Sequence, residues 1–190
     1  CDEFSQKDSR IIVIHKENGG LSSARNAGLS IASGKYIGFV DGDDWVAREM
    51  YQELYELAES EKAQIVSCQH KKVYENEKDE NTENAGGTGA FTVLGKEEAL
   101  KRFFLREISE SIWDKLFLRE MFEDIRFPLG EINEDTPVVA GLLIKSQKTV
   151  FVERELYFYR KRPGSITQSG YSEKFRVVDA HIRQINSIMK

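Results

Sequence analysis

Three carboxylates stand together at the point where a buried strand should end. The stretch IGFVDGDDWV, residues 37–46, runs from apolar residues directly into Asp41, Asp43 and Asp44. Carboxylates this close repel one another, which drives one or more towards protonation unless a cation is present. Mg²⁺ and Mn²⁺ prefer oxygen ligands, commonly one or two carboxylates together with phosphate oxygens. The spacing therefore fits a site at which Asp41 and Asp43 bind a divalent metal and a diphosphate.

An acidic strand end is also compatible with sites of a different kind. Asp-Gly is a common turn pair, and a solvated acidic loop needs no metal. A calcium-binding EF-hand loop that began at Asp41 would need Gly at its sixth position and Glu at its twelfth, but Val46 and Gln52 stand there. An aspartyl phosphatase could use Asp41 as nucleophile and Asp43 as acid. That alternative fits less well, because such enzymes usually follow the second Asp with a small hydroxyl residue.

The elements expected around this acidic tip, residues 41–44, form a strand–helix–strand unit. RIIVIH, residues 10–15, predicts a strand, and the apolar spacing of residues 21–34 predicts a helix. KYIGFV, residues 35–40, predicts a second strand. This order predicts a parallel pair with a right-handed crossover and helices on both sheet faces. Ligands bind at the carboxyl ends of strands in such sheets, which is where Asp41 would lie.

The rest of the chain predicts further helices and strands around one polar segment, within a single α/β domain of residues 1–190. Helices are expected at 46–62, 95–107, 133–146 (with Asn133 as cap) and 172–190 (basic and amphipathic), a flexible loop or hairpin at 75–90, and strands at 64–74 and 148–162, the latter bent or paired.

Composition narrows the class of protein. The chain has 190 residues and a net charge of -5, which argues against a nucleic-acid partner. Its two cysteines, Cys1 and Cys68, do not suggest a disulfide framework and favour a reducing compartment. No apolar run approaches the ~18 residues that a membrane-spanning helix needs. We therefore expect a cytoplasmic protein.

The segment around the tip resembles the signature of family 2 glycosyltransferases, which have the GT-A fold. Residues 18–44, NGGLSSARNAGLSIASGKYIGFVDGDD, contain Asn-x-Gly, Ala-Arg-Asn-x-Gly, Ala-x-Gly and an apolar strand that ends in Asp-x-Asp-Asp. The set in this order is specific, although each part alone is weak. The positions that match are Asn18, Gly20, Ala24, Arg25, Asn26, Gly28, Ala32, Gly34, Asp41, Asp43 and Asp44. The resemblance continues through WDKLF at 113–117, NED at 133–135 and YFYRKRPGSIT at 157–167.

The resemblance implies a fold and a departure from it. The expected fold is GT-A-like and Rossmann-like, with a mixed, mainly parallel sheet flanked by helices. The family normally begins with a strand and a helix that lead to a motif for the nucleotide base. This chain starts at CDEFSQKDSR, which resembles the end of the helix after that motif. We therefore expect the first βα elements to be missing and the chain as given to have little or no activity.

The resemblance also implies roles for the acidic residues. Asp43, with Asp41, would hold Mn²⁺ or Mg²⁺ against the diphosphate of a nucleotide-sugar donor, foremost a UDP-sugar. Arg25 would neutralise the nucleotide or stack on its base. Asp135 would be the general base that deprotonates the acceptor hydroxyl, so it should face the tip across a pocket. Apart from the resemblance, Glu134 and Asp135 need only stabilise a helix dipole, by ~0.3–1 kcal/mol.

The function expected is that of a bacterial, metal-dependent, inverting hexosyltransferase in cell-surface polysaccharide synthesis. The acceptor would be a saccharide or a lipid-linked saccharide, and the protein could associate peripherally with the inner face of the membrane. The alternatives are a non-catalytic sugar- or partner-binding module and the aspartyl phosphatase. Secondary expectations concern Asn26 (a structural hydrogen bonder), Gly20 and Gly28 (tight turning and close backbone approach), Trp45 (core or pocket wall), Lys115 (acceptor side), Trp113 (core packing before the acceptor side), Tyr159, Arg160 and Arg162 (diphosphate or acceptor contacts, or a charged strand end), and His15, His70 and His181 (structural or exposed).

Overall fold

The computed structural model describes residues 1–74, 85–131 and 133–161 of the chain. The helix predicted at 172–190, most of the loop predicted at 75–90, and the side chains of Arg162 and His181 lie outside these residues.

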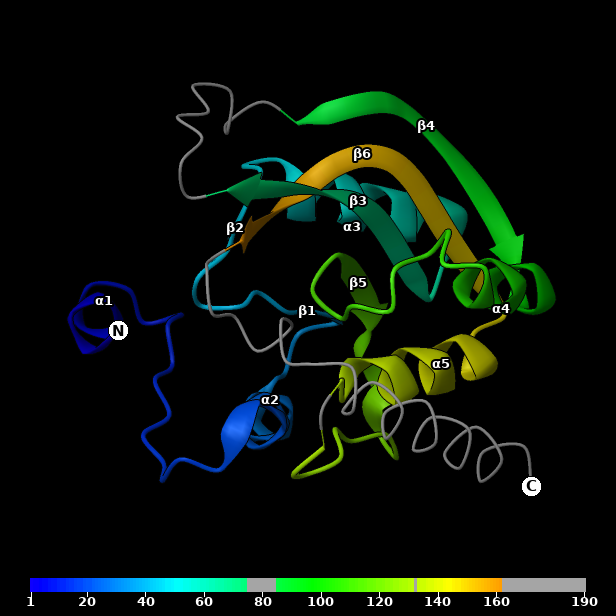
Figure 1. The fold of residues 1–190 in the computed structure, drawn as a ribbon. Coiled ribbons are helices and arrows are strands. Elements are labelled where there is room, and N and C mark those ends of the chain that lie inside the picture. The colour runs from blue at the N-terminus through cyan, green and yellow to red at the C-terminus, as the bar shows by residue number, and fades with distance from the viewer. Residues whose placement is uncertain (75–84, 132, 162–190) are drawn as a thin grey trace.

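A six-stranded curled sheet forms the centre of the molecule (Figure 1). Its strands run in the order β1-β5-β3-β6-β2, and β4 pairs with β6. The longest strand, β6, arches over the molecule and pairs with β2, β3 and β4. The strands are β1 Tyr36–Gly38, β2 Trp45–Val46, β3 Ile65–Tyr74, β4 Gly86–Gly95, β5 Lys115–Leu118 and β6 Lys148–Lys161.

Helices cover both faces of the sheet. On one face, α3 buries Met50, Leu54 and Ala58 in a cluster with β3 and β6. On the other face, α4 and α5 form a second cluster with β1, β5 and a short 3₁₀ helix. The helices are α1 Asp2–Lys7, α2 Gly20–Ile31, α3 Met50–Glu61, α4 Lys96–Phe104, α5 Asp135–Lys145 and η1 Arg119–Phe122. The predicted α/β class and the mixed sheet with helical flanks are confirmed.

The prediction of a strand at residues 10–15 was wrong. These residues do not form a strand, and Ile11, Ile12 and Ile14 are exposed. A strand needs a neighbour for its backbone hydrogen bonds, and no described strand pairs with this segment. The parallel strand–helix–strand unit is therefore absent from the described residues, and β1 pairs antiparallel with β5.

The prediction of a mainly parallel sheet also fails among the described pairings. Only β3 and β6 run parallel, and the other pairs are antiparallel. The sequence pattern could not distinguish these arrangements, because a short strand buried on both faces has the same apolar run in either direction.

The predicted loop at 75–90 is partly a strand, since β4 begins at Gly86. Its glycines favour a loop by composition, but β6 supplies the backbone partner. The register shifts between Gly87 and Phe91, and Gly87 has a φ of 100°, a left-handed value that glycine tolerates. Pairing with β6 therefore overrides the local composition.

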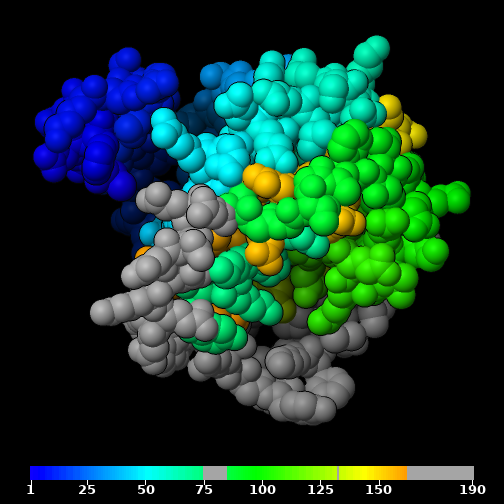
Figure 2. Space-filling view, turned by 90° about the horizontal axis from the view of Figure 1, so that it is seen from above, coloured from blue at the N-terminus to red at the C-terminus, as the bar shows by residue number. Residues whose placement is uncertain are grey.

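Most other predicted elements are present with shifted ends. The helix predicted at 46–62 begins at Met50, because Trp45–Val46 pairs with β6 instead. Asn133 is not the cap of α5, whose N-cap is Glu134. Residues 1–19, dark blue in Figures 1 and 2, project from one side, and α1 buries none of its residues.

Candidate active site

The acidic tip is a tight turn attached to β6 by one tyrosine. The Asp44 amide donates to the Asp41 carbonyl at 3.1 Å, which closes the turn. The buried Tyr157 hydroxyl accepts from the Asp41 amide at 3.1 Å and donates to Asp44 Oδ2 at 2.8 Å. Asp44 Oδ1 accepts from the Arg160 amide at 2.9 Å. Asp44 thus fixes the tip to β6, even though burial raises its pKa against these hydrogen bonds.

Arg25 joins the tip to the first turn of α5. Its guanidinium donates through Nη2 to Asp41 Oδ1 at 2.9 Å and through Nη1 to Glu134 Oε1 at 2.8 Å. Nη1 also contacts Asp135 Oδ1. The side chain of Arg25 is only 6% exposed. The side chains of the three carboxylates are at most 24% exposed. One buried cation therefore holds Asp41 and Asp135 on the same side of the molecule.

The position of Arg25 is fixed by the next residue of α2, Asn26, and by the Phe127 ring. The Asn26 amide brackets the backbone of Phe127, donating to its carbonyl at 2.8 Å and accepting from its amide at 2.9 Å. The Phe127 ring then lies 5.3 Å from the Arg25 guanidinium carbon. Gly20, which begins α2, has a φ of 80°, whereas a Cβ on Gly28 would meet no atom within 4 Å. The structural role of Asn26 and the turn role of Gly20 are as predicted, and Gly28 allows no close approach.

Asp135 is largely buried and lies among other charged groups. Burial raises the pKa of Asp135 to about 6, although Arg25 and the Ile112 amide, which donates to Oδ2 at 3.1 Å, act against the rise. The nearby carboxylates of Glu134 and Asp41 add to it. Asp135 is therefore a stronger base than an ordinary aspartate and is still ionised near neutral pH.

The tip offers oxygen ligands of the kind that a hard divalent cation prefers. Asp43 is exposed, and its carboxylate neither accepts a hydrogen bond from another described residue nor pairs with one. Asp41 is partly exposed beside it. Within residues 1–74, 85–131 and 133–161, no three His, Cys, Asp or Glu side chains form a metal-binding group. The donor set thus fits an ion that takes its other ligands from phosphate and water.

The structure places the secondary residues around this site. Trp113 is buried and stacks on Tyr157 with ring centroids 4.2 Å apart, so it packs beneath the tip. Trp45 stacks on Phe158, and the Arg160 guanidinium carbon lies 5.2 Å from its ring. Tyr159 also stacks on Trp113, the His70 ring meets Trp113 edge-on at 4.8 Å, and Lys115 is fully buried. His15 lies away from the site, exposed on the N-terminal segment beside Asp2.

Two features of the site escaped the sequence patterns. Tyr157 lies 113 positions from Asp44, and no local signal connects them. Asp114 and Lys115 form a fully buried ion pair with Nζ and Oδ1 2.6 Å apart. The sequence offered one signal for this pair. Two adjacent charged residues of opposite sign lie in the mostly apolar segment 112–118, and charges that are buried occur in pairs.

Comparison with known proteins identifies the family. A family model described as Glycosyl transferase family 2 matches residues 1–126. The chain belongs to glycosyltransferase family 2. The uncharacterized glycosyltransferase EpsJ of Bacillus subtilis is 36% identical to this family 2 chain over 97% of it. Glycosyltransferase GlyA of Streptococcus pneumoniae is 34% identical, also over 97% of the chain.

The match covers only part of these relatives. The family 2 chain spans 54% of EpsJ and 27% of GlyA. Among solved structures, Staphylococcus aureus TarS in complex with UDP-GlcNAc superimposes with a TM-score of 0.66 and 18% identity. That superposition covers 90% of this chain and 48% of the TarS chain. The likeness confirms the GT-A-like fold.

The described helices include none that is both long and apolar enough to cross a bilayer.

Proposed function

We propose that this chain carries the donor-binding and catalytic groups of a glycosyltransferase that moves a sugar from a nucleotide diphosphate sugar to a hydroxyl acceptor with inversion. One observation carries the proposal: Arg25 bonds to Asp41 at the strand end and to Asp135 at the start of α5. A donor whose diphosphate lies at the tip would thus present its anomeric carbon near Asp135. Family membership favours this transfer over the phosphatase chemistry that the Asp-x-Asp spacing also allows.

In this proposal Asp135 is the general base. Its carboxylate takes the proton from the acceptor hydroxyl while that oxygen attacks the anomeric carbon of the donor. The bond between that carbon and the diphosphate oxygen breaks, and the nucleoside diphosphate leaves with the electron pair. Attack opposite the leaving group inverts the anomeric centre. A pKa of about 6 suits this role, because the group is ionised at neutral pH but more basic than a solvated aspartate.

Arg25 and the tip provide binding and charge balance. Asp43 and Asp41 would hold Mn²⁺ or Mg²⁺, which when bound acts as a Lewis acid on the leaving diphosphate. Arg25 offsets the charge that Asp135 and Asp41 bring to the site, and it remains our candidate for a contact with the nucleotide. Asp44 and Tyr157 hold the tip at a fixed height above β6.

Donor and acceptor classes follow from the relatives as proposals. TarS has been crystallised with UDP-GlcNAc and with UDP, which supports a UDP-sugar donor here. The Minor teichoic acid biosynthesis protein GgaB of Bacillus subtilis is 28% identical over 85% of this chain. We therefore propose a saccharide or lipid-linked acceptor in surface-polymer synthesis, at the cytoplasmic face of the membrane and with no nucleic-acid partner.

The test is donor-dependent transfer by the full-length protein. With Mn²⁺, a panel of UDP-sugars should yield one donor from which sugar moves to acceptor, and Asp43→Ala should abolish turnover. Glu97→Ala, at an exposed acid on α4, is the matched control. Transfer that survives both chelation and Asp43→Ala would defeat the metal role. Donor binding without turnover would instead indicate a sugar- or partner-binding module, and a phospho-aspartate at Asp41 a phosphatase.

A further inference from the structure

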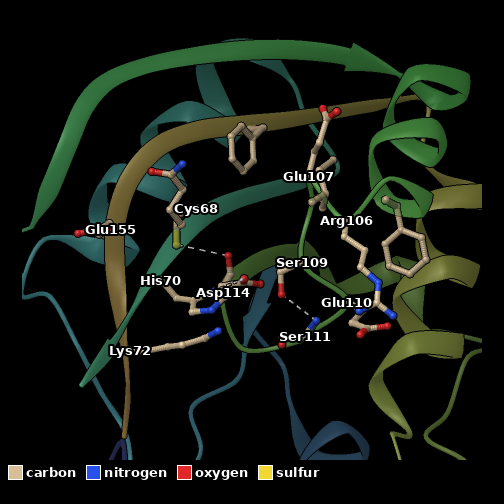
Figure 3. Close-up of a pocket in the computed structure, with 14 residues that line it drawn as sticks. Cys68, His70, Lys72, Arg106, Glu107, Ser109, Glu110, Ser111, Asp114 and Glu155 are labelled. Carbon is tan, nitrogen blue, oxygen red and sulfur yellow. Dashed lines mark hydrogen bonds and ion pairs between the residues drawn. The ribbon is translucent and has the colours of Figure 1, made fainter. Parts of the chain in front are cut away.

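A cavity of about 500 Å³ lies between β3 and the segment that follows α4 (Figure 3). One wall is β3 from Cys68 to Lys72, and the other is the segment 106–111 that follows α4. Phe103 of α4, Asp114, and Phe151 and Glu155 of β6 complete the lining. The volume lies within the range of small-ligand sites and accommodates one to two sugar rings.

A buried carboxylate lies against this cavity. Asp114 lines it and is 0% exposed. Its Oδ1 accepts from Lys115 Nζ at 2.6 Å, whereas its Oδ2 has no hydrogen-bond partner among the described residues. His70 Nδ1 lies 3.5 Å from Oδ2, which is a charge contact at the limit of hydrogen bonding. Asp114 therefore orients His70, a partly exposed lining side chain that can form a hydrogen bond with a sugar hydroxyl.

The cavity wall is held rigidly and is shared with the candidate active site. Lys115 Nζ donates to the carbonyls of Ser109 and Ser111 at 2.8 and 2.7 Å, and these two bonds fix the wall formed by residues 106–111. The next residue, Ile112, donates its amide to Asp135 Oδ2. On the same segment, Glu110 accepts from the Thr136 hydroxyl of α5 at 3.1 Å. A molecule in the cavity would therefore lie at a fixed position relative to Asp135.

The chemistry of the lining selects the ligand. Carboxylates outnumber the lysine and arginine side chains, which disfavours a diphosphate or an acidic sugar. Many separate donors and acceptors surround the space, and two phenylalanine rings offer apolar surface for the C–H face of a pyranose. The charged lining residues are Lys72, Arg106, Glu107, Glu110, Asp114 and Glu155, with His70, and the aromatic ones are Phe103 and Phe151.

We propose that this cavity is a subsite for a neutral sugar ring of the acceptor, next to the ring whose hydroxyl meets Asp135. The inference rests on the proposed transfer reaction and adds a second position at which the acceptor is recognised. Acceptors with at least two rings would then bind better than single sugars, and neutral rings better than uronates.

The test is saccharide binding to the full-length protein by saturation-transfer NMR, with lactose, maltose, N,N′-diacetylchitobiose and glucuronic acid as probes. At least one neutral disaccharide should bind with a Kd of about 1 mM, and glucuronic acid should not. Glu107→Gln with Glu155→Gln should weaken that binding about tenfold by removing charged acceptors. The exposed pair Glu97→Gln with Glu120→Gln is the matched control and should leave it unchanged.

A second variant and a second ligand keep the outcomes separate. Gln69→Trp places bulk in the cavity from an exposed position and should abolish disaccharide binding. UDP with Mn²⁺ should bind all variants equally, which reports an intact fold and donor site. The subsite is refuted if no neutral disaccharide binds, if the cavity variants bind it normally, or if UDP displaces it. Loss of UDP binding in the unmodified protein would refute the proposed function instead, whatever the disaccharides do.

Discussion

Relative to the unmodified protein, Asp135→Asn should gain stability as the pH rises from acid to neutral. The carboxylate is 17% exposed and faces Arg25, Glu134 and Asp41. Burial is the largest influence on its pKa, which rises from 3.8 to about 6. The folded protein therefore binds this proton more tightly than the unfolded chain does. The contribution to stability is complete below the unfolded pKa and is lost as the pH rises through the folded one.

The magnitude follows from the size of the rise. About two pKa units correspond to about 3 kcal/mol of stability lost between pH ~4 and pH ~7. An asparagine side chain at this position would have no proton to lose, so the variant should not show this loss. The free energy of unfolding of Asp135→Asn, relative to the unmodified protein, should thus increase by about 3 kcal/mol over that interval. Ionised Asp135 would thus lower the stability of the folded protein, as expected for a group kept for activity at the expense of stability.

The assay is urea unfolding of both proteins at several pH values, with the free energy extrapolated linearly to water. Glu97→Gln, measured in parallel, corrects for the loss of one negative charge. The reasoning is refuted if Asp135→Asn loses stability relative to the unmodified protein as the pH rises. That result would mean that Arg25 outweighs burial and that the pKa of Asp135 is lowered.

Three further predictions concern the supports of the site. Tyr157→Phe should cost ~1–2 kcal/mol of unfolding free energy and raise the Kd for UDP with Mn²⁺ in calorimetry, because the tip loses both of its hydrogen bonds to the Tyr157 hydroxyl. Tyr55→Phe, at an exposed tyrosine on α3, should leave that Kd unchanged. Lys115→Met should cost about 3–5 kcal/mol in thermal unfolding, because it leaves Asp114 unpaired. Adding Asp114→Leu should recover part of this loss, since the Ser109 and Ser111 carbonyls still lack their donor, and a double variant no more stable than the single one would contradict the reasoning. The turnover number should fall as the pH drops below about 6, because protonated Asp135 cannot accept the hydroxyl proton, and a flat profile down to pH ~4 would oppose it.

The local parts of the site could be predicted from the sequence. An apolar strand that ends in Asp41 and Asp43 places repelling carboxylates together, which indicates a bound cation. The periodicity of residues 135–146 predicts a helix whose first turn is acidic. The facing of Asp41 and Asp135 follows from the family resemblance, not from the pattern of either segment. Arg25 was expected at the nucleotide, while its contacts in the structure are with the carboxylates.

The long-range parts could not be predicted from the sequence. The strand propensity of residues 10–15 is real, but a strand exists only where a neighbour pairs with it. Conversely, the glycine-rich start of β4 forms a strand because β6 is adjacent. The bond between Asp44 and Tyr157 likewise depends on how β6 lies over the tip. These outcomes depend on which segments meet in space, and a single sequence contains no direct record of that.

The role of Asp135 as the base is tested most directly by separating turnover from donor binding in one variant. Asp135→Asn keeps the size of the side chain and a neutral partner for Arg25, so the Kd for the UDP-sugar with Mn²⁺ should change little in calorimetry. The turnover number should fall by ~10²–10⁴-fold, the usual contribution of a general base. Transfer within a few-fold of the unmodified rate, with donor binding intact, would show that another group takes the proton.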